Sequence, residues 1–148
     1  MATVDKVATI KALVEEIFRY ISTPSNLVEV WPSLVEINDV RSLPNGGYSA
    51  QWVYEMVGMR FEGTAEYTDI APNHWFIIET QGDIKSRITW TFRSVNNIDD
   101  ITKVTLTIEY EAPFQLLRKL SEAIIMEFTN HEGELMIDNL KNRFAVTS

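Results

Sequence analysis

Apolar and polar residues alternate along most of the chain, which is the period-two pattern of half-buried β-strands. Turn residues separate several of these segments, as in the Pro-Asn-Gly-Gly sequence at residues 44–47. The last six segments follow one another through short turns, so we expect an antiparallel meander, because parallel neighbours would need crossover helices. The predicted strands are residues 3–10, 34–43, 48–57, 59–70, 74–81, 84–95 and 102–112.

Helical periodicity occurs in two other parts of the chain. After the first strand, apolar residues recur every three or four positions over residues 12–22, which predicts an amphipathic helix. Thr23 and Pro24 end this helix and can begin a second short one, with Thr23 as its N-cap, which Trp31 and the following proline stop. Residues 114–143 contain no proline and predict one long C-terminal helix of roughly 45 Å. Gly133 in this helix marks a bend, clearance for a ligand or a packed aromatic, or a break into two helices.

The strand pattern gives the sheet one wet face and one dry face, although residues 74–81 are apolar on both faces and are not oriented by it. Aromatic residues are frequent on the dry face. Tyrosine and tryptophan carry a polar atom that needs a partner when buried, which suits a concave, mostly apolar binding site. Alternatively, the tyrosines lie at the sheet margin with their hydroxyls in water. The candidate ligand-binding residues on this face are Tyr48, Trp52, Tyr54, Phe61, Tyr67, Trp90, Phe92 and Tyr110.

The predicted C-terminal helix adds Ile124, Phe128 and His131 to the candidate site, because they fall on its apolar stripe. A histidine in an apolar cavity could orient a ligand carbonyl or act as a general base. Alternatively, His131 is a packed side chain that is simply hydrogen-bonded. The acidic residues of this helix are expected to form a solvated face: Glu127, Glu132, Glu134 and Asp138.

The composition narrows the possible functions. The 148 residues, 45% hydrophobic and 23% charged, are typical of one soluble globular domain over residues 1–148. The net charge of -8 argues against binding to nucleic acid or to an anionic membrane surface. No cysteine, HExxH, P-loop or dinucleotide-binding motif is present, so no metal and no cofactor is expected. We see no signal peptide or transmembrane segment and expect a cytoplasmic protein, while the oligomeric state stays open.

The order of predicted elements resembles the helix-grip fold of the START-like superfamily, also called SRPBCC, which includes polyketide cyclases and dehydratases. Val14–Ile21, the Pro-Ser-Asn-Leu sequence at residues 24–27 and the Trp-Pro pair at 31–32 are similar to the family's segment "eeVfdyisdpenlpeWwP". The family often has a proline before the first helix, where this chain has alanine and leucine. The resemblance implies an α+β fold, with a curved antiparallel sheet around the C-terminal helix and a cavity between them for a hydrophobic or amphipathic molecule.

Three functions are compatible with this resemblance. The first is non-catalytic binding of a lipid, polyketide or isoprenoid-like molecule, which the scarcity of ionisable groups on the predicted dry face favours. The second is a polyketide cyclase or dehydratase in which His131 or a pocket tyrosine transfers a proton. The third is a protein-interaction or co-chaperone-like module, which would be expected to carry an exposed apolar patch.

Overall fold

The sheet contains all of the predicted strands and is antiparallel throughout, in the spatial order β1-β7-β6-β5-β4-β3-β2. The computed structural model describes residues 2–95 and 98–145, which contain seven strands and four helices. The meander and the α+β helix-grip arrangement predicted from the sequence are confirmed. The strands are β1 (Ala2–Ile10), β2 (Leu34–Ser42), β3 (Tyr48–Met56), β4 (Met59–Ala71), β5 (Trp75–Gly82), β6 (Ser86–Val95) and β7 (Ile98–Tyr110).

The two short helices after β1 are α1 (Val14–Ile21) and α2 (Pro24–Val30), as the sequence predicts. Pro24 occupies the first turn of α2. A backbone N–H in that turn has no acceptor within the helix, so the proline loses no hydrogen bond there. Thr23 is the N-cap residue of α2, as predicted, and its carbonyl oxygen accepts a 3.0 Å hydrogen bond from the backbone N–H of Asn26. Its side chain does not cap α2, because the hydroxyl donates a 2.8 Å hydrogen bond to the carbonyl oxygen of Arg19 in α1.

The C-terminal region forms two helices, α3 (Phe114–Leu117) and α4 (Glu122–Arg143), and the prediction of one helix over residues 114–143 is wrong. Ser121 separates them, since its side chain accepts a 3.2 Å hydrogen bond from the backbone N–H of Ile124 and caps α4. The 22 residues of α4 give it a length of about 33 Å. Even this helix lacks the apolar run needed to cross a bilayer, and so do the other helices of residues 2–95 and 98–145.

Gly133 lies inside α4 without breaking it, so a break at this position is also wrong. A Cβ atom at Gly133 would lie 3.3 Å from both Val4 Cγ1 and Lys6 Cγ on β1. The absence of a side chain therefore lets α4 pack closely on the first strand. A salt bridge at 3.2 Å between Lys6 and Glu134 lies beside this contact.

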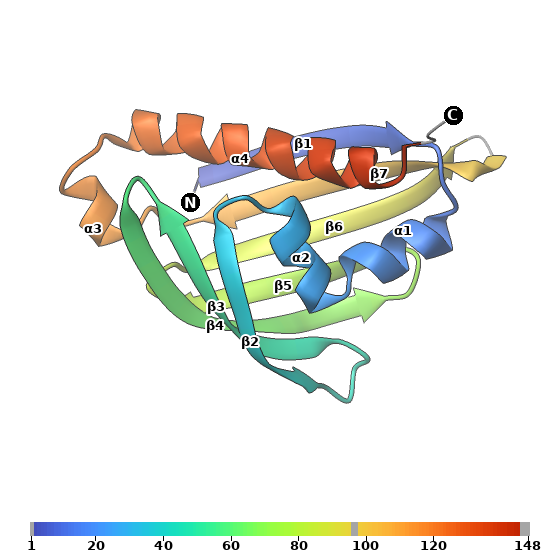
Figure 1. The fold of residues 1–148 in the computed structure, drawn as a ribbon, viewed down its shortest axis with the longest axis horizontal. Helices are drawn as coiled ribbons and strands as arrows, with labels where there is room; N and C mark the ends of the chain where they lie inside the picture. Colours follow the sequence, from blue (N-terminus) through green and yellow to red (C-terminus); the bar gives the residue numbers. More distant parts are fainter. Residues whose placement is uncertain (1, 96–97, 146–148) are drawn as a thin grey trace.

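The sheet curves around the helices, which cover its concave face (Figure 1). Helix α4 packs on β1 and α2, while α2 packs on β2 and α1 packs on β6 and β7. The concave face carries most of the buried side chains of the strands, with Val53 of β3 buried on the opposite face. Burial also orients β5, because Phe76 and Ile78 are buried whereas Trp75 is exposed. The dry and wet faces predicted from alternation are confirmed.

An aromatic cluster fills the concave face beneath α1. Phe76 stacks with Tyr67, Trp90 and Phe92, with ring centroids 5.4 to 6.3 Å apart. Phe18 of α1 meets Phe76 edge-on at 5.8 Å. This end of the sheet is therefore a packed core, and space for a ligand has to lie elsewhere on the concave face.

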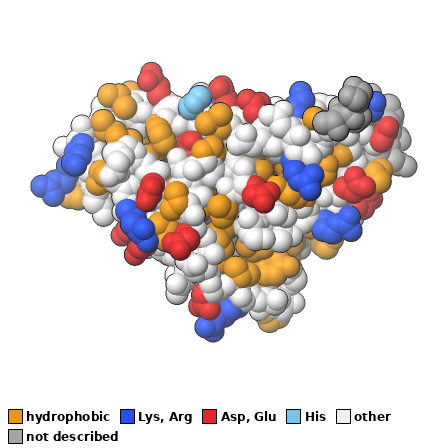
Figure 2. All heavy atoms as spheres, viewed as in Figure 1, with side chains coloured by type: hydrophobic (Ala, Val, Ile, Leu, Met, Phe, Trp, Pro, Cys, Tyr) orange, Lys and Arg blue, Asp and Glu red, His pale blue; other side chains and the backbone are white. Residues whose placement is uncertain are grey.

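Charged and apolar side chains share the outer surface. Figure 2 shows acidic and basic side chains interspersed over one face, with hydrophobic side chains between them. Among the described residues, the large apolar side chain with the greatest exposure is Phe114 of α3, which is 72% exposed. Leu117 and Ile124 beyond it are also exposed.

Candidate functional site

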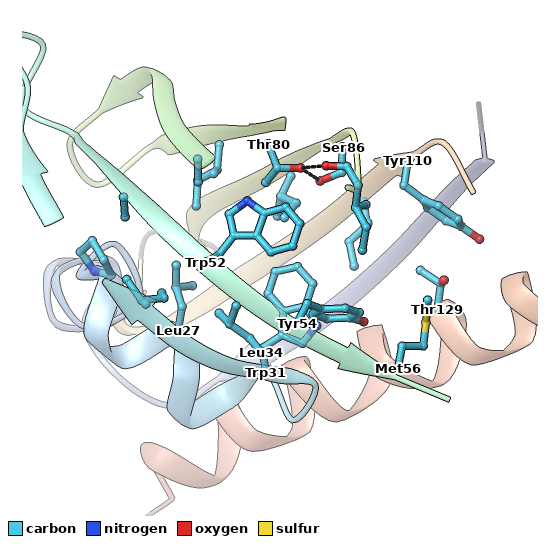
Figure 3. A pocket seen from close by; sticks show the side chains of 18 of the residues that line it. Leu27, Trp31, Leu34, Trp52, Tyr54, Met56, Thr80, Ser86, Tyr110 and Thr129 are labelled. Carbon is cyan, nitrogen blue, oxygen red and sulfur yellow. Dashed lines mark hydrogen bonds between the residues drawn. The ribbon is translucent and has the colours of Figure 1, made fainter. Parts of the chain in front are cut away.

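A cavity lies between the concave face of the sheet and helices α2 and α4 (Figure 3). Its volume is about 100 Å³, measured as the space open to the centre of a water-sized molecule. One water molecule needs roughly 10–15 Å³ by this measure, so the cavity can hold a larger molecule. The wall is almost entirely apolar, and its polar side chains are few.

The alternation of the strands builds the sheet side of the wall, because every second residue points to the concave face. Strand β3 contributes Trp52, Tyr54 and Met56 in this way. Ala50 and Ala65 lie directly opposite each other on β3 and β4 and also line the cavity. Two small side chains at facing positions leave space that larger residues would fill.

Hydroxyl groups in the wall are largely occupied by bonds within the protein. The Thr80 hydroxyl donates to the carbonyl oxygen of Ile84 at 3.1 Å and lies 2.5 Å from the Ser86 hydroxyl, as Figure 3 shows. Because the single proton of Thr80 is used in this way, Ser86 donates to Thr80. Thr129 of α4 donates to the carbonyl oxygen of Ile125 at 3.0 Å. These groups therefore contribute little free hydrogen-bonding capacity to a ligand.

Two wall tyrosines are deeply buried and remain protonated. The Tyr67 hydroxyl donates a 2.7 Å hydrogen bond to the carbonyl oxygen of Ser22, and burial raises the pKa of this hydroxyl far above its usual range. Burial also raises the pKa of the Tyr54 hydroxyl, and the negative charge of Glu132 raises it further. Both groups are neutral hydrogen-bond donors near neutral pH, and neither is a base.

The structure places four of the predicted dry-face aromatics in the cavity wall: Trp52, Tyr54, Tyr67 and Tyr110. The indole N–H of Trp52 donates to the carbonyl oxygen of Thr64 at 2.9 Å, which fixes the ring.

The other four aromatics do not line the cavity. Trp90 and Phe92 belong to the aromatic cluster beneath α1, and Phe61 is fully buried in the core. Tyr48 is half-buried and meets the edge of Tyr67 at 5.5 Å. They are packed against the core, so the sequence pattern identified the face correctly but did not divide it into cavity and core.

The expectation that Ile124, Phe128 and His131 face the cavity is wrong. Ile124 is 50% exposed, His131 is exposed, Phe128 is half-buried, and none of the three lines the cavity. The predicted stripe treated residues 114–121 as part of the same helix, but they precede α4, and the inward face of α4 lies one position later in the sequence. Ile125 and Thr129 line the cavity instead.

Two residues that the sequence analysis did not assign to the site lie close to Tyr54. Glu132 was expected in the solvated face of the helix, but it is only 4% exposed and accepts a 3.1 Å hydrogen bond from the backbone N–H of Ser33. Its position seven residues after Ile125 places it on the same inward face of α4. Trp31 lines the cavity as well.

Comparison with known proteins gives the family. The family described as "Polyketide cyclase / dehydrase and lipid transport" matches residues 1–145. The chain belongs to this family. No curated protein matches the sequence significantly.

Solved structures similar to this one support the helix-grip fold. A protein from Thermus thermophilus has a TM-score of 0.81 at 18% identity, covering 97% of each chain. A START superfamily protein from Mycobacterium smegmatis has a TM-score of 0.79 at 15% identity, covering 96% of each chain. The Zhui aromatase/cyclase from Streptomyces sp. R1128 has a TM-score of 0.76 at 12% identity, covering 96% of this chain and 92% of the other.

Proposed function

We propose that this member of the family binds a small apolar or amphipathic molecule in the cavity between the sheet and α4, without catalysing a reaction. The observation that carries the proposal is a cavity of about 100 Å³ whose wall is almost entirely apolar. A ligand that fills this space gains roughly 25 cal/mol for each Å² of apolar surface removed from water. Lipids, polyketides and isoprenoid-like molecules have surfaces of this kind.

The polar groups of the wall favour binding over catalysis. Tyr67, Thr80 and Thr129 already donate to backbone carbonyl oxygens, so their protons are not free for transfer. A general base must be poised near the working pH, whereas burial keeps the Tyr54 and Tyr67 hydroxyls protonated by raising the pKa of each.

Native mass spectrometry of the purified protein, followed by solvent extraction, tests this proposal. We expect a bound molecule on the natural chain and its loss from Ala65→Leu, because the larger side chain fills the cavity. Ala123→Leu makes the same change at an exposed position of α4 and should keep the molecule. Equal retention in both variants would contradict the proposal. So would an empty protein whose melting temperature does not respond to a panel of lipids and polyketides.

A second candidate is an enzyme of the polyketide cyclase or dehydratase type, which family membership and the fold shared with an aromatase/cyclase favour. Since His131 is exposed, the candidate proton donor is Tyr54, which lines the cavity beside Glu132. Cyclisation of a linear polyketide that Tyr54→Phe abolishes would support this function. Turnover unchanged in Tyr54→Phe would exclude Tyr54 from the chemistry.

One observation supports the hypothesis of a protein-interaction module: the apolar side chains of Phe114, Leu117 and Ile124 are exposed around the α3–α4 junction. Phe114→Ser combined with Ile124→Ser should leave binding in the cavity unchanged, because neither residue lines it. Loss of a co-purifying protein from this double variant would support the interaction hypothesis.

A further inference from the structure

Small residues surround the ring of Trp52 on the concave face of the sheet. Gly63 of β4 lies directly opposite Trp52, and Ala50 of β3 lies directly opposite Ala65 of β4. Residues two positions apart on a strand point to the same face, so these four positions form one patch. Both alanines line the cavity, as Trp52 does. The space above the alanine pair is therefore bordered by the indole ring.

The nitrogen-bearing edge of the indole lies against β4. Its N–H donates a 2.9 Å hydrogen bond to the carbonyl oxygen of Thr64. A Cβ atom at Gly63 would lie 2.5 Å from Trp52 Cζ2 and 2.9 Å from Trp52 Cε2, so this edge fits there because residue 63 has no side chain. With this edge held on the strand, the ring turns a face toward the cavity (Figure 3).

A molecule in the cavity can reach this ring. Trp52 is 7% exposed, whereas Trp90 on the same face of the sheet is 0% exposed and lies outside the cavity wall. The contact needs no free polar atom, because the indole N–H is already bonded and the face of the ring remains. An aromatic face attracts a second aromatic ring more strongly than the burial of apolar surface alone predicts.

A second fixed aromatic ring lies on the other side of the alanine pair. Tyr67 lies two positions after Ala65 on β4, on the same face and roughly 13 Å from Gly63 along the strand. It lines the cavity, and its hydrogen bond to Ser22 and its stacking on Phe76 hold it in place. The space above Ala65 therefore lies between two aromatic side chains that are both fixed by contacts within the protein.

We infer that Trp52 makes the cavity selective for flat, unsaturated rings over saturated rings and acyl chains of the same carbon number. This inference rests on the proposed binding function and names the class of ligand. Burial of apolar surface alone would favour the saturated molecules, because they carry more apolar surface. Stacking on the indole reverses that order, since only a flat ring can lie against the indole face over its whole area.

Calorimetric titration with three methyl ketones of equal carbon number tests the inference: 2-acetonaphthone, 2-acetyldecalin and 2-dodecanone. The first carries a flat aromatic ring system, the second its saturated counterpart and the third an open chain. We expect 2-acetonaphthone to bind roughly twofold to tenfold more tightly than either saturated ketone, as one stacked aromatic pair predicts.

Variants of Trp52 assign the preference to its ring. Trp52→Leu removes the aromatic face and should abolish the preference for 2-acetonaphthone. Trp52→Phe keeps an aromatic face and should retain most of the preference. Trp75→Leu is the matched control, because Trp75 is exposed on the opposite face of the sheet and its replacement should leave the preference unchanged.

Equal affinities for the three ketones, or tighter binding of either saturated ketone, would overturn the inference and leave the proposed function standing. So would a preference for 2-acetonaphthone that persists in a folded Trp52→Leu protein. The titrations of the natural chain decide the inference where a variant does not fold. Failure of all three ketones to bind the folded natural chain would overturn both the inference and the proposed function.

Discussion

The hydroxyl of Tyr67 donates a 2.7 Å hydrogen bond to the carbonyl oxygen of Ser22 and so joins the cavity wall on β4 to the end of α1. The Tyr67 ring also stacks on Phe76, with centroids 5.4 Å apart. Because this tyrosine is held at both its ring and its hydroxyl, it serves as a fixed part of the wall. Its polar atom binds the backbone and is not available to a ligand.

Removal of this hydroxyl should destabilise the fold. Tyr67→Phe leaves the Ser22 carbonyl oxygen without its donor in a buried position, so we expect the free energy of unfolding to fall by about 1–3 kcal/mol. Urea denaturation measures the change. Tyr48→Phe is the matched control, because the Tyr48 ring is half-buried and meets the same Tyr67 ring edge-on. Equal losses in the two variants would show that the bond to Ser22 contributes no specific stability.

The buried tyrosines also predict that stability declines at alkaline pH. Burial raises the pKa of the Tyr54 and Tyr67 hydroxyls above the ordinary value of 10.0, so the folded chain retains protons that the unfolded chain releases. Their contribution is complete below pH 10 and is lost as the pH rises above it. Each tyrosine adds a slope of at most about 1.4 kcal/mol per pH unit.

Urea denaturation between pH 9 and pH 11 tests this pH dependence, because the Tyr67→Phe variant removes one of the two groups. The variant should lose stability less steeply with pH than the natural chain does. Parallel pH profiles would contradict the account of Tyr67 as a buried group that stays protonated.

Gly133 should tolerate no large side chain, because it lies where α4 meets β1. Leucine there would push against Val4 and Lys6, whose atoms lie 3.3 Å from the position of a Cβ. We expect Gly133→Leu to reduce the free energy of unfolding by about 1–3 kcal/mol, despite the better helix propensity of leucine. Asn130→Leu places the same side chain at an exposed position of α4 and should cost little. A Gly133→Leu protein as stable as the natural chain would mean that α4 and β1 are less closely packed.

Ser121 should contribute to the free energy of unfolding, because its side chain caps the first turn of α4. Its side chain accepts a hydrogen bond from the N–H of Ile124, so Ser121→Ala should cost about 1 kcal/mol in thermal or urea unfolding. Ser121→Asp keeps an acceptor and should restore most of the loss. If the aspartate variant is no better than the alanine variant, the cap contributes little to stability.

The strands were predictable because alternation records which face of each strand is buried. β3 and β4 bury the residues expected from their pattern, such as Trp52 and Phe61. β5 could not be oriented from its sequence, since Trp75 and Ile77 are as apolar as Phe76 and Ile78. Its pairing with β4 and β6 decides which side chains enter the core.

The inward face of the C-terminal helix could not be predicted because it depends on how the helix packs on the sheet. The predicted stripe was placed as if residues 114–121 belonged to the same helix, whereas α4 begins at Glu122 and buries Ile125 and Glu132 rather than Ile124 and His131. Neighbouring positions on an α-helix point about 100° apart, so a stripe placed one residue too early exchanges buried and exposed residues.

The sequence predicted the kind of site, an apolar cavity, but only some of the residues that line it. Tyrosine and tryptophan on the concave face indicated an apolar cavity with polar points, and Trp52, Tyr54, Tyr67 and Tyr110 line it. Whether an inward residue faces the cavity or the core depends on what covers it. The sequence pattern does not contain that information.

The most direct measurement of the central claim, an apolar molecule held inside the cavity, uses two neighbouring isoleucines. Ile125 lines the cavity, whereas Ile124 is 50% exposed and lies outside it. With isoleucine methyl groups labelled for NMR and 2-acetonaphthone added, nuclear Overhauser contacts report which methyl groups touch the probe. We predict contacts to Ile125 and to the cavity residues Ile88 and Ile108, with none to Ile124. Contacts to Ile124 without contacts to Ile125 would place the molecule outside the cavity and contradict this account.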